Sequence, residues 1–132
     1  MDPGVRELFG EGRNFQTLAT LMPDGSPHAV SVWSAVDGEH ILFFTANERS
    51  QKARNVRRDP RVALSVVDLE NPYRTARVRG EVVEVVTGER AGALVDAMSE
   101  RYVGEPFPVR EGHQVFVVEP RRASFSELPF TH

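Results

Sequence analysis

The sequence predicts a mainly β domain of the α+β class, with six or seven mostly antiparallel strands and two or three short helices. Several short runs alternate apolar and polar residues, as strands with one buried face do. Turn-forming residues separate neighbouring runs at short spacing, which is typical of hairpin connections. The helical patterns are too few to cover both faces of a doubly wound parallel sheet. Together these observations favour an antiparallel β-barrel.

The N-terminal segment is expected to form a short helix over residues 3–9, because proline suits the first turn of a helix. Residues 14–21 form a predicted strand in which alternate residues share one face, namely Phe15, Thr17, Ala19 and Leu21. A Pro-Asp-Gly-Ser turn follows at residues 23–26, where Gly25 can adopt a positive φ.

The next elements continue the hairpin pattern and then change to a helix. Residues 28–36 alternate as a second strand, antiparallel to the first. The Asp-Gly pair at 37–38 predicts a tight turn into a third strand over 39–45. A basic helix is expected over 48–57, and the Asp-Pro pair at 59–60 should end it.

The C-terminal half is predicted to add further strands and a second longer helix. Residues 61–67 and 73–86 are rich in β-formers, and Gly80 suggests a bulge or a close backbone approach. Apolar residues at spacings of three and four predict a helix over 88–102. The last expected strands are short, at residues 114–118 and 123–125.

Composition limits the classes of function. A chain of 132 residues predicts one domain covering residues 1–132. The absence of cysteine excludes disulfides, thiolate metal sites and cysteine nucleophiles. The net charge of −3 argues against a general nucleic-acid binder. Residues 1–4 do not resemble the start of a signal peptide, and no apolar run suits a membrane span. We therefore expect a cytoplasmic protein with no membrane or nucleic-acid partner.

The most informative segment is the strand-to-helix junction over residues 44–55. A helix start presents unpaired backbone N–H groups and the positive end of the helix dipole. Ser50 adds a hydroxyl and Lys52 adds a full charge, a combination that suits a phosphate group. The junction is not a P-loop, because the glycines are missing. The alternative is that these basic residues form only a solvated helix face.

Side chains for acid–base or metal chemistry are scarce. The histidines are scattered with no pair at metal-ligand spacing, so no metal site is predicted. His28 is a weak catalytic candidate, since it begins a strand that should border the basic junction, but it also suits an ordinary strand end. No nucleophile–base pair is visible, so a cofactor would have to supply the chemistry of an enzyme.

Two aromatic residues have a functional and a structural interpretation. Trp33 suits core or dimer packing, or its backbone and that of Val32 could line the edge of a flat heterocycle. Tyr73 and Arg74 suit a strand-end turn, or they could lie over a ligand held by a second subunit.

An ordered set of motifs now resembles a known family. The set comprises residues 19–28, Val30-Ser31-Val32-Trp33, Phe44-Thr45, residues 50–55, Arg58-Asp59-Pro60-Arg61-Val62, Asn71-Pro72-Tyr73-Arg74, Val78-Arg79-Gly80 and Arg101-Tyr102-Val103-Gly104. It resembles the pyridoxamine 5′-phosphate oxidase-like superfamily, whose fold is the FMN-binding split β-barrel. The resemblance covers about residues 5–126. More specifically, the set of motifs is similar to the branch that uses the deazaflavin coenzyme F420.

The resemblance implies a homodimer with two cofactor sites at its interface. It places Thr45, Ser50 and Lys52 at the cofactor phosphate, Asn55 near it, and Val32 and Trp33 at the tricyclic ring. A second subunit would contribute further residues. The resulting cofactor-binding set is Val32, Trp33, Thr45, Ala46, Arg49, Ser50, Gln51, Lys52, Asn55, Tyr73 and Arg79.

Departures from the family pattern refine the expected function. Pyridoxamine phosphate oxidases have an arginine where this chain has Gln51, and their C-terminal substrate-binding Trp and Arg have no counterpart in residues 123–128. Extra arginines at 49, 54 and 57 match the acidic tail of F420 better than FMN. The implied activity is hydride transfer between F420 and a conjugated enone, quinone or tetrapyrrole. The alternatives are an FMN oxidoreductase and a non-enzymatic F420 carrier, while haem is disfavoured because no histidine suits an axial position.

Overall fold

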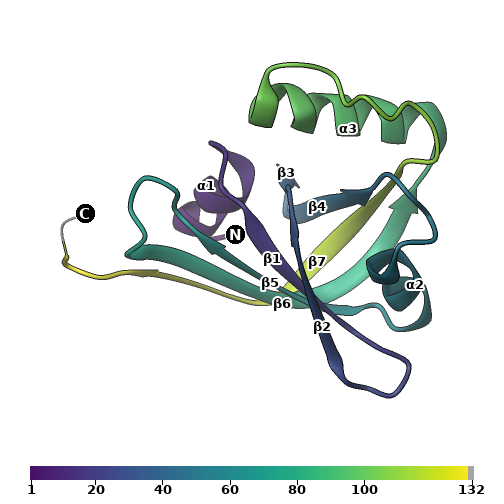
Figure 1. Cartoon of the computed structure of the whole chain (residues 1–132). Coiled ribbons are helices and arrows are strands. Elements are labelled where there is room, and N and C mark those ends of the chain that lie inside the picture. The colour runs from purple at the N-terminus through teal and green to yellow at the C-terminus, as the bar shows by residue number, and fades with distance from the viewer. Residues whose placement is uncertain (131–132) are drawn as a thin grey trace.

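The protein, described here by a computed structural model over residues 1–130, is built around one antiparallel sheet that curls into a split barrel (Figure 1). The seven strands follow the order β2-β1-β5-β6-β7-β4-β3, and three helices accompany them. These findings confirm the predicted α+β split-barrel class. The elements are α1 (Pro3–Gly10), β1 (Gln16–Leu21), β2 (Pro27–Val32), β3 (Ala35–Asp37), β4 (His40–Thr45), α2 (Gln51–Arg58), β5 (Arg61–Val67), β6 (Arg74–Val86), α3 (Gly88–Val103) and β7 (Gln114–Glu127).

The predicted single strand over residues 28–36 is wrong, because the chain breaks into β2 and β3. β2 pairs with β1 and β3 pairs with β4, so residues 33–34 carry the chain between the two edges of the sheet. Ser34 fixes this crossing, since its hydroxyl donates to the Phe9 carbonyl oxygen at 2.7 Å. Its backbone N–H also lies 3.4 Å from the hydroxyl oxygen of Tyr102. Contacts with α1 and α3 therefore override the local alternation.

The basic helix begins later than predicted, at Gln51 rather than residue 48. Residues 46–50 form a turn instead, because Ser50 caps the helix by accepting from the Ala53 N–H at 3.3 Å. The helix ends at Arg58 before Asp59, as the Asp-Pro pair predicted.

The two predicted C-terminal strands are in fact one long strand, β7, which pairs with β6 from Val115 to Glu127. Pro120 has no N–H to donate, but it lies opposite Gly80, where a shift of register already interrupts the ladder. A Cβ atom at Gly80 would lie 2.3 Å from the Glu119 carbonyl oxygen. Both the predicted bulge and the predicted close backbone approach are therefore confirmed.

Two apolar cores hold the fold together. The barrel core packs the apolar faces of α1 and α2 against β1, β5, β6 and β7, with residues such as Phe9, Leu18 and Phe116. A second core packs α3 onto β4 and β7 through Val95 and Val115. Of the predicted β1 faces, the outward one contains Phe15, which is exposed, whereas the buried face is Gln16, Leu18 and Thr20. Within residues 1–130, no helix has the length and apolarity needed to cross a membrane.

Candidate functional site

The predicted anion site forms a tight turn between β4 and α2. The Thr45 hydroxyl donates to the Asn47 carbonyl oxygen at 2.7 Å and lies 2.9 Å from the Ser50 hydroxyl. The Asn47 side chain accepts from the Arg49 N–H at 2.9 Å. These bonds hold the positive end of the α2 dipole beside the end of β4.

The hydrogen bonds within this turn already use the Thr45 and Ser50 hydroxyls, so neither hydroxyl has a hydrogen left to donate to a ligand. Each hydroxyl carries one hydrogen. Thr45 gives its hydrogen to Asn47, so Ser50 is the donor in its contact with Thr45. Neither hydroxyl can then donate to a phosphate unless it rotates. In this structure Thr45 and Ser50 shape the turn, and their contact with a cofactor phosphate stays a prediction.

Lys52 is the residue of this segment best placed to meet an anion. It is the only lysine in the sequence, and it is half-buried in the first turn of α2. Among residues 1–130, no ion pair involves its ammonium group. Burial lowers the pKa of Lys52, because the charged form loses hydration. An anion beside it would restore the lost stabilisation of this charge.

Lys52 opens onto a cleft of about 350 Å³, and half of the residues that line it are aromatic. The cleft brings together four predicted site residues: Val32, Trp33, Ala46 and Lys52. The other lining residues were not predicted, and they are Phe15, Ser31, Phe44 and Phe107. A cleft with several aromatic side chains and one cation suits a planar ring that bears an anionic substituent.

The aromatic walls are held by ring contacts from distant parts of the chain. Trp33 stacks on Tyr102 with centroids 4.9 Å apart and planes 8° apart. Phe107 meets the Trp33 ring edge-on at 6.0 Å and the Phe44 ring at 5.3 Å. The Tyr102 hydroxyl donates to the Asn14 carbonyl oxygen at 2.6 Å. The aromatic partners of Trp33 thus come from α3, from the loop after it and, through Phe44 at 6.1 Å, from β4.

Asn55 supports the site from beneath and does not face the cleft. It is fully buried, and its amide donates to the Thr20 hydroxyl at 3.0 Å. Its side-chain oxygen accepts from Gln51 at 2.8 Å and from Arg58 at 3.2 Å. These bonds tie α2 to β1, so Asn55 and Gln51 position the helix that carries Lys52.

The basic residues around α2 differ in how much of their charge is available. Arg54 donates to the Gln51 side chain, Arg57 to the Glu48 carbonyl oxygen, and Arg58 to the Leu21 carbonyl oxygen. Arg49, by contrast, is exposed at the turn, where its backbone N–H bonds to Asn47. Lys52 and Arg49 are therefore the cations of this segment that remain most open to a ligand.

Among the predicted residues, Thr45, Arg49, Ser50, Gln51 and Asn55 lie around Lys52 without lining the cleft, and His28, Tyr73 and Arg79 lie in other parts of the chain. His28 lies on β2 opposite Thr20, and its Nδ1 atom is buried without a hydrogen-bond partner among residues 1–130. Tyr73 lies in the β5–β6 turn, and this turn is at the other end of the barrel from α2 (Figure 1). Arg79 is exposed on β6 and lines a groove on the outer face of the sheet.

Comparison with known proteins assigns the family. The sequence profile described as pyridoxamine 5′-phosphate oxidase matches residues 1–127. The chain belongs to the pyridoxamine 5′-phosphate oxidase family. This finding confirms the superfamily that the motif order predicted.

Relatives within the pyridoxamine 5′-phosphate oxidase family differ in their names. A pyridoxine/pyridoxamine 5′-phosphate oxidase of Kineococcus radiotolerans is 40% identical over 76 residues, which is 58% of this chain and 33% of the relative. The match with this chain therefore spans about a third of that relative. A solved structure named F420 reductase shares 35% identity with a TM-score of 0.81, covering 94% of this chain and 98% of that one. A conserved hypothetical protein of Mycobacterium tuberculosis shares 27% identity with a TM-score of 0.80, covering 100% and 91%.

Proposed function

We propose that this protein is an F420-dependent oxidoreductase that acts on a conjugated small molecule, an enone, quinone or tetrapyrrole. The proposal rests on the half-buried Lys52 ammonium, which has no ion-pair partner in the described chain and borders a cleft lined in part by aromatic residues. When bound, the reduced deazaflavin supplies a hydride to an electron-poor double bond. FMN is the alternative cofactor of the same site, and a non-enzymatic F420 carrier is the alternative role.

The residues of the cleft fit such a cofactor. Lys52 and the backbone N–H groups of Gln51 and Lys52 would hold a phosphate, because these two N–H groups have no acceptor within the helix, whereas the Ala53 N–H is bound by the Ser50 hydroxyl. The ring would lie between the Val32–Trp33 segment and the aromatic side chains of the cleft. Arg49 is exposed next to this site and would meet acidic groups farther along the cofactor.

Similarity supports F420 over pyridoxamine phosphate as the chemistry of this chain. The structure named F420 reductase matches this chain over nearly its full length, whereas the named pyridoxine/pyridoxamine 5′-phosphate oxidase matches over 58% of it. The Gln51 side chain is a neutral amide that offers no charge to a phosphate, and it is already bonded to Asn55 and Arg54.

Equilibrium binding of oxidised F420 and of FMN to the purified apoprotein, followed by fluorescence, tests the proposal. We expect preference for F420 and a loss of about ten-fold or more in affinity in Lys52→Ala, because a charge-assisted contact is removed. Arg90→Ala is the matched control, since it removes an exposed cation of α3. Preference for FMN would move the protein to the flavin alternative, and unaltered affinity in Lys52→Ala would contradict the assigned role of Lys52. Tight F420 binding without reduction of enones, quinones or tetrapyrroles would favour the carrier.

We further propose that the protein forms a homodimer through the outer face of β1, β5 and β6. Two adjoining grooves of about 650 and 560 Å³ lie there, and none of their lining residues comes from a helix. The lining includes small residues such as Ala19 and Ala63, along with Arg79. Such a face permits close approach of a second sheet, which would bring Tyr73 and Arg79 to the partner's cleft.

Sedimentation velocity of the wild type and of Arg79→Glu tests the dimer. We expect a dimer for the wild type and weaker association by about ten-fold or more in Arg79→Glu, because a charge reversal in an interface costs several kcal/mol. Arg13→Glu is the control, since Arg13 is exposed and lines neither groove. A monomeric wild type at high concentration would rule out this assembly.

A further inference from the structure

The segment between α3 and β7 has the build of a hinged flap. Gly104 and Gly112 lie near its two ends, with φ of 78° and 81°, and can absorb changes in backbone angles. Pro106 and Pro108 stiffen the middle. From residue 105 to residue 113, no backbone–backbone hydrogen bond joins the segment to the rest of the described chain. A segment of this kind can open at a lower cost than the strands of the barrel.

A single carboxylate holds the flap against α3. Asp96 accepts from the Phe107 N–H at 3.1 Å and from the Arg110 guanidinium at 2.8 and 3.0 Å. The same guanidinium donates to the Phe107 carbonyl oxygen at 2.8 Å. The hydrogen bonds from Arg110 lower the pKa of Asp96, so the carboxylate is charged at neutral pH. We call this group of contacts, made by Asp96, Phe107 and Arg110, the latch.

Phe107 connects the latch to the cleft. Its ring forms part of the cleft wall and lies against Trp33 and Phe44. On another side it meets the ring of His113 at 5.8 Å. His113 is 6% exposed, and neither of its ring nitrogens has a hydrogen-bond partner in the described chain. The closed flap thus buries an unsatisfied polar ring, which weakens the closed state relative to one with a satisfied residue there.

We propose that residues 104–113 form a flap over the cleft, that the latch holds it closed, and that Phe107 is the side chain that limits which ring systems reach Trp33. The closed cleft of about 350 Å³ is near the lower end of the usual size of ligand sites. Opening the flap removes one wall and admits a larger conjugated substrate beside a cofactor ring. Asp96 and Arg110 are positioning residues, since they act on the cleft only through Phe107.

The single tryptophan of the chain allows a direct test without any cofactor. Trp33 lies under Phe107, so acrylamide quenching of its fluorescence measures how often the flap is open. We expect the quenching constant to rise by roughly two-fold in Asp96→Ala and by less in Arg110→Ala, because the first removes every hydrogen bond to the latch carboxylate. Arg110→Ala alters an exposed side chain outside the helices, and it covers the case in which Asp96→Ala does not fold.

Arg90→Ala is the matched control, because it removes an ion pair of α3 with Glu84 that makes no contact with the flap. Quenching that is equal in the wild type and in both latch variants would overturn the proposal. An equal rise in Arg90→Ala would also overturn it, since that would indicate general loosening of α3. The gating role rests on the proposed function of the cleft. The quenching is measured on the apoprotein, however, so loss of F420 binding and failure of the flap are distinguishable.

Discussion

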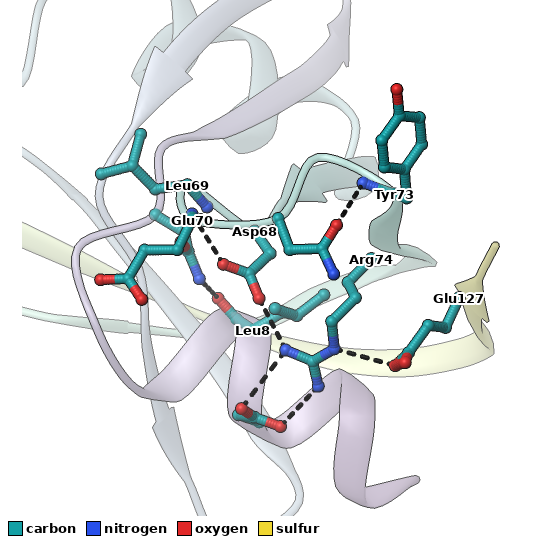
Figure 2. A network of polar contacts seen from close by, with 10 residues as sticks. Leu8, Asp68, Leu69, Glu70, Tyr73, Arg74 and Glu127 are labelled. Carbon is teal, nitrogen blue, oxygen red and sulfur yellow. Dashed lines mark hydrogen bonds and ion pairs between the residues drawn. The ribbon is translucent and has the colours of Figure 1, made fainter. Parts of the chain in front are cut away.

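Two charged regions at opposite ends of the barrel differ in how fully their charges are paired. At the β5–β6 turn, Arg74 uses its whole guanidinium group on three carboxylates (Figure 2). The distances are 2.9 Å to Glu7, 2.6 Å to Asp68 and 3.0 Å to Glu127. At the other end, Lys52 borders the cleft with no ion pair in the described chain.

The difference separates a structural charge from one available to a ligand. The Arg74 network joins α1, the β5–β6 turn and β7, which are far apart in sequence, so its value is to hold elements together. This finding removes Arg74 from the residues that could lie over a ligand, because all of its nitrogen atoms are engaged. An unpaired, half-buried cation such as Lys52 lowers the stability of the folded state instead, which is tolerable where a ligand compensates.

The largest expected effect comes from removing the paired charge. Arg74→Ala leaves Asp68 with a side chain that is only 17% exposed and without its cation. We expect the free energy of unfolding to fall by about 2 kcal/mol, less than for a fully buried pair, because solvent reaches Glu7 and Glu127. Urea unfolding measures this loss. Arg90→Ala is the control, since its exposed pair with Glu84 at 3.4 Å should contribute about 0.5 kcal/mol or less.

A charge-preserving change sharpens that prediction. Arg74→Lys keeps the charge but cannot reach three carboxylates with one planar group, so it should recover only part of the loss. If Arg74→Ala is as stable as Arg90→Ala, the network contributes no more than an ordinary surface ion pair. Arg74 would then not be a structural charge, and its contrast with Lys52 would be wrong.

Local chemistry was enough to predict most elements and the turn that carries Lys52. Gly80 marked the bulge in β6, and the Asp-Pro pair ended α2, because both effects act within a few residues. Lys52 was found because a cation two residues after a serine, at the predicted start of a helix, needs no distant partner to be recognised. Family motifs then added an expected cofactor, which composition and spacing alone left open.

The cleft walls could not be predicted in the same way, because they depend on contacts between residues far apart in sequence. Trp33 meets Tyr102 and Phe107 across about seventy positions, which no periodicity encodes. The break between β2 and β3 has the same origin, since Ser34 bonds to Phe9 on α1. Phe107 lies between two prolines, and that unusual loop was the one local sign of its role.

The smallest effect is expected from Lys52, and its sign is opposite to that of Arg74. Lys52→Met keeps the bulk of the side chain and removes the desolvated charge, so the ligand-free variant should unfold about 1–2 °C higher than the wild type. Differential scanning calorimetry of the apoprotein measures this shift, and Arg49→Met is the exposed control that should leave the midpoint unchanged.

The pH dependence of that gain is fixed by the lowered pKa of Lys52. Between this folded-state pKa and the unfolded value of about 10.4, the unfolded chain binds more protons, so the stability of the wild type rises with pH. The advantage of Lys52→Met should therefore be greatest at neutral pH and shrink as the pH approaches about 10.4. The Arg74 network has the same sign of pH slope but acts in the acidic range, because the pKa of Asp68 is also lowered on folding. Burial raises the pKa of Asp68, but hydrogen bonds from the Glu70 N–H and from Arg74 lower it by more than burial raises it. The stability that Asp68 contributes is therefore lost in acid.

A lower midpoint for Lys52→Met at neutral pH would mean that Lys52 already has a stabilising partner. The proposal that the cleft binds an anionic ligand would then lose its main support.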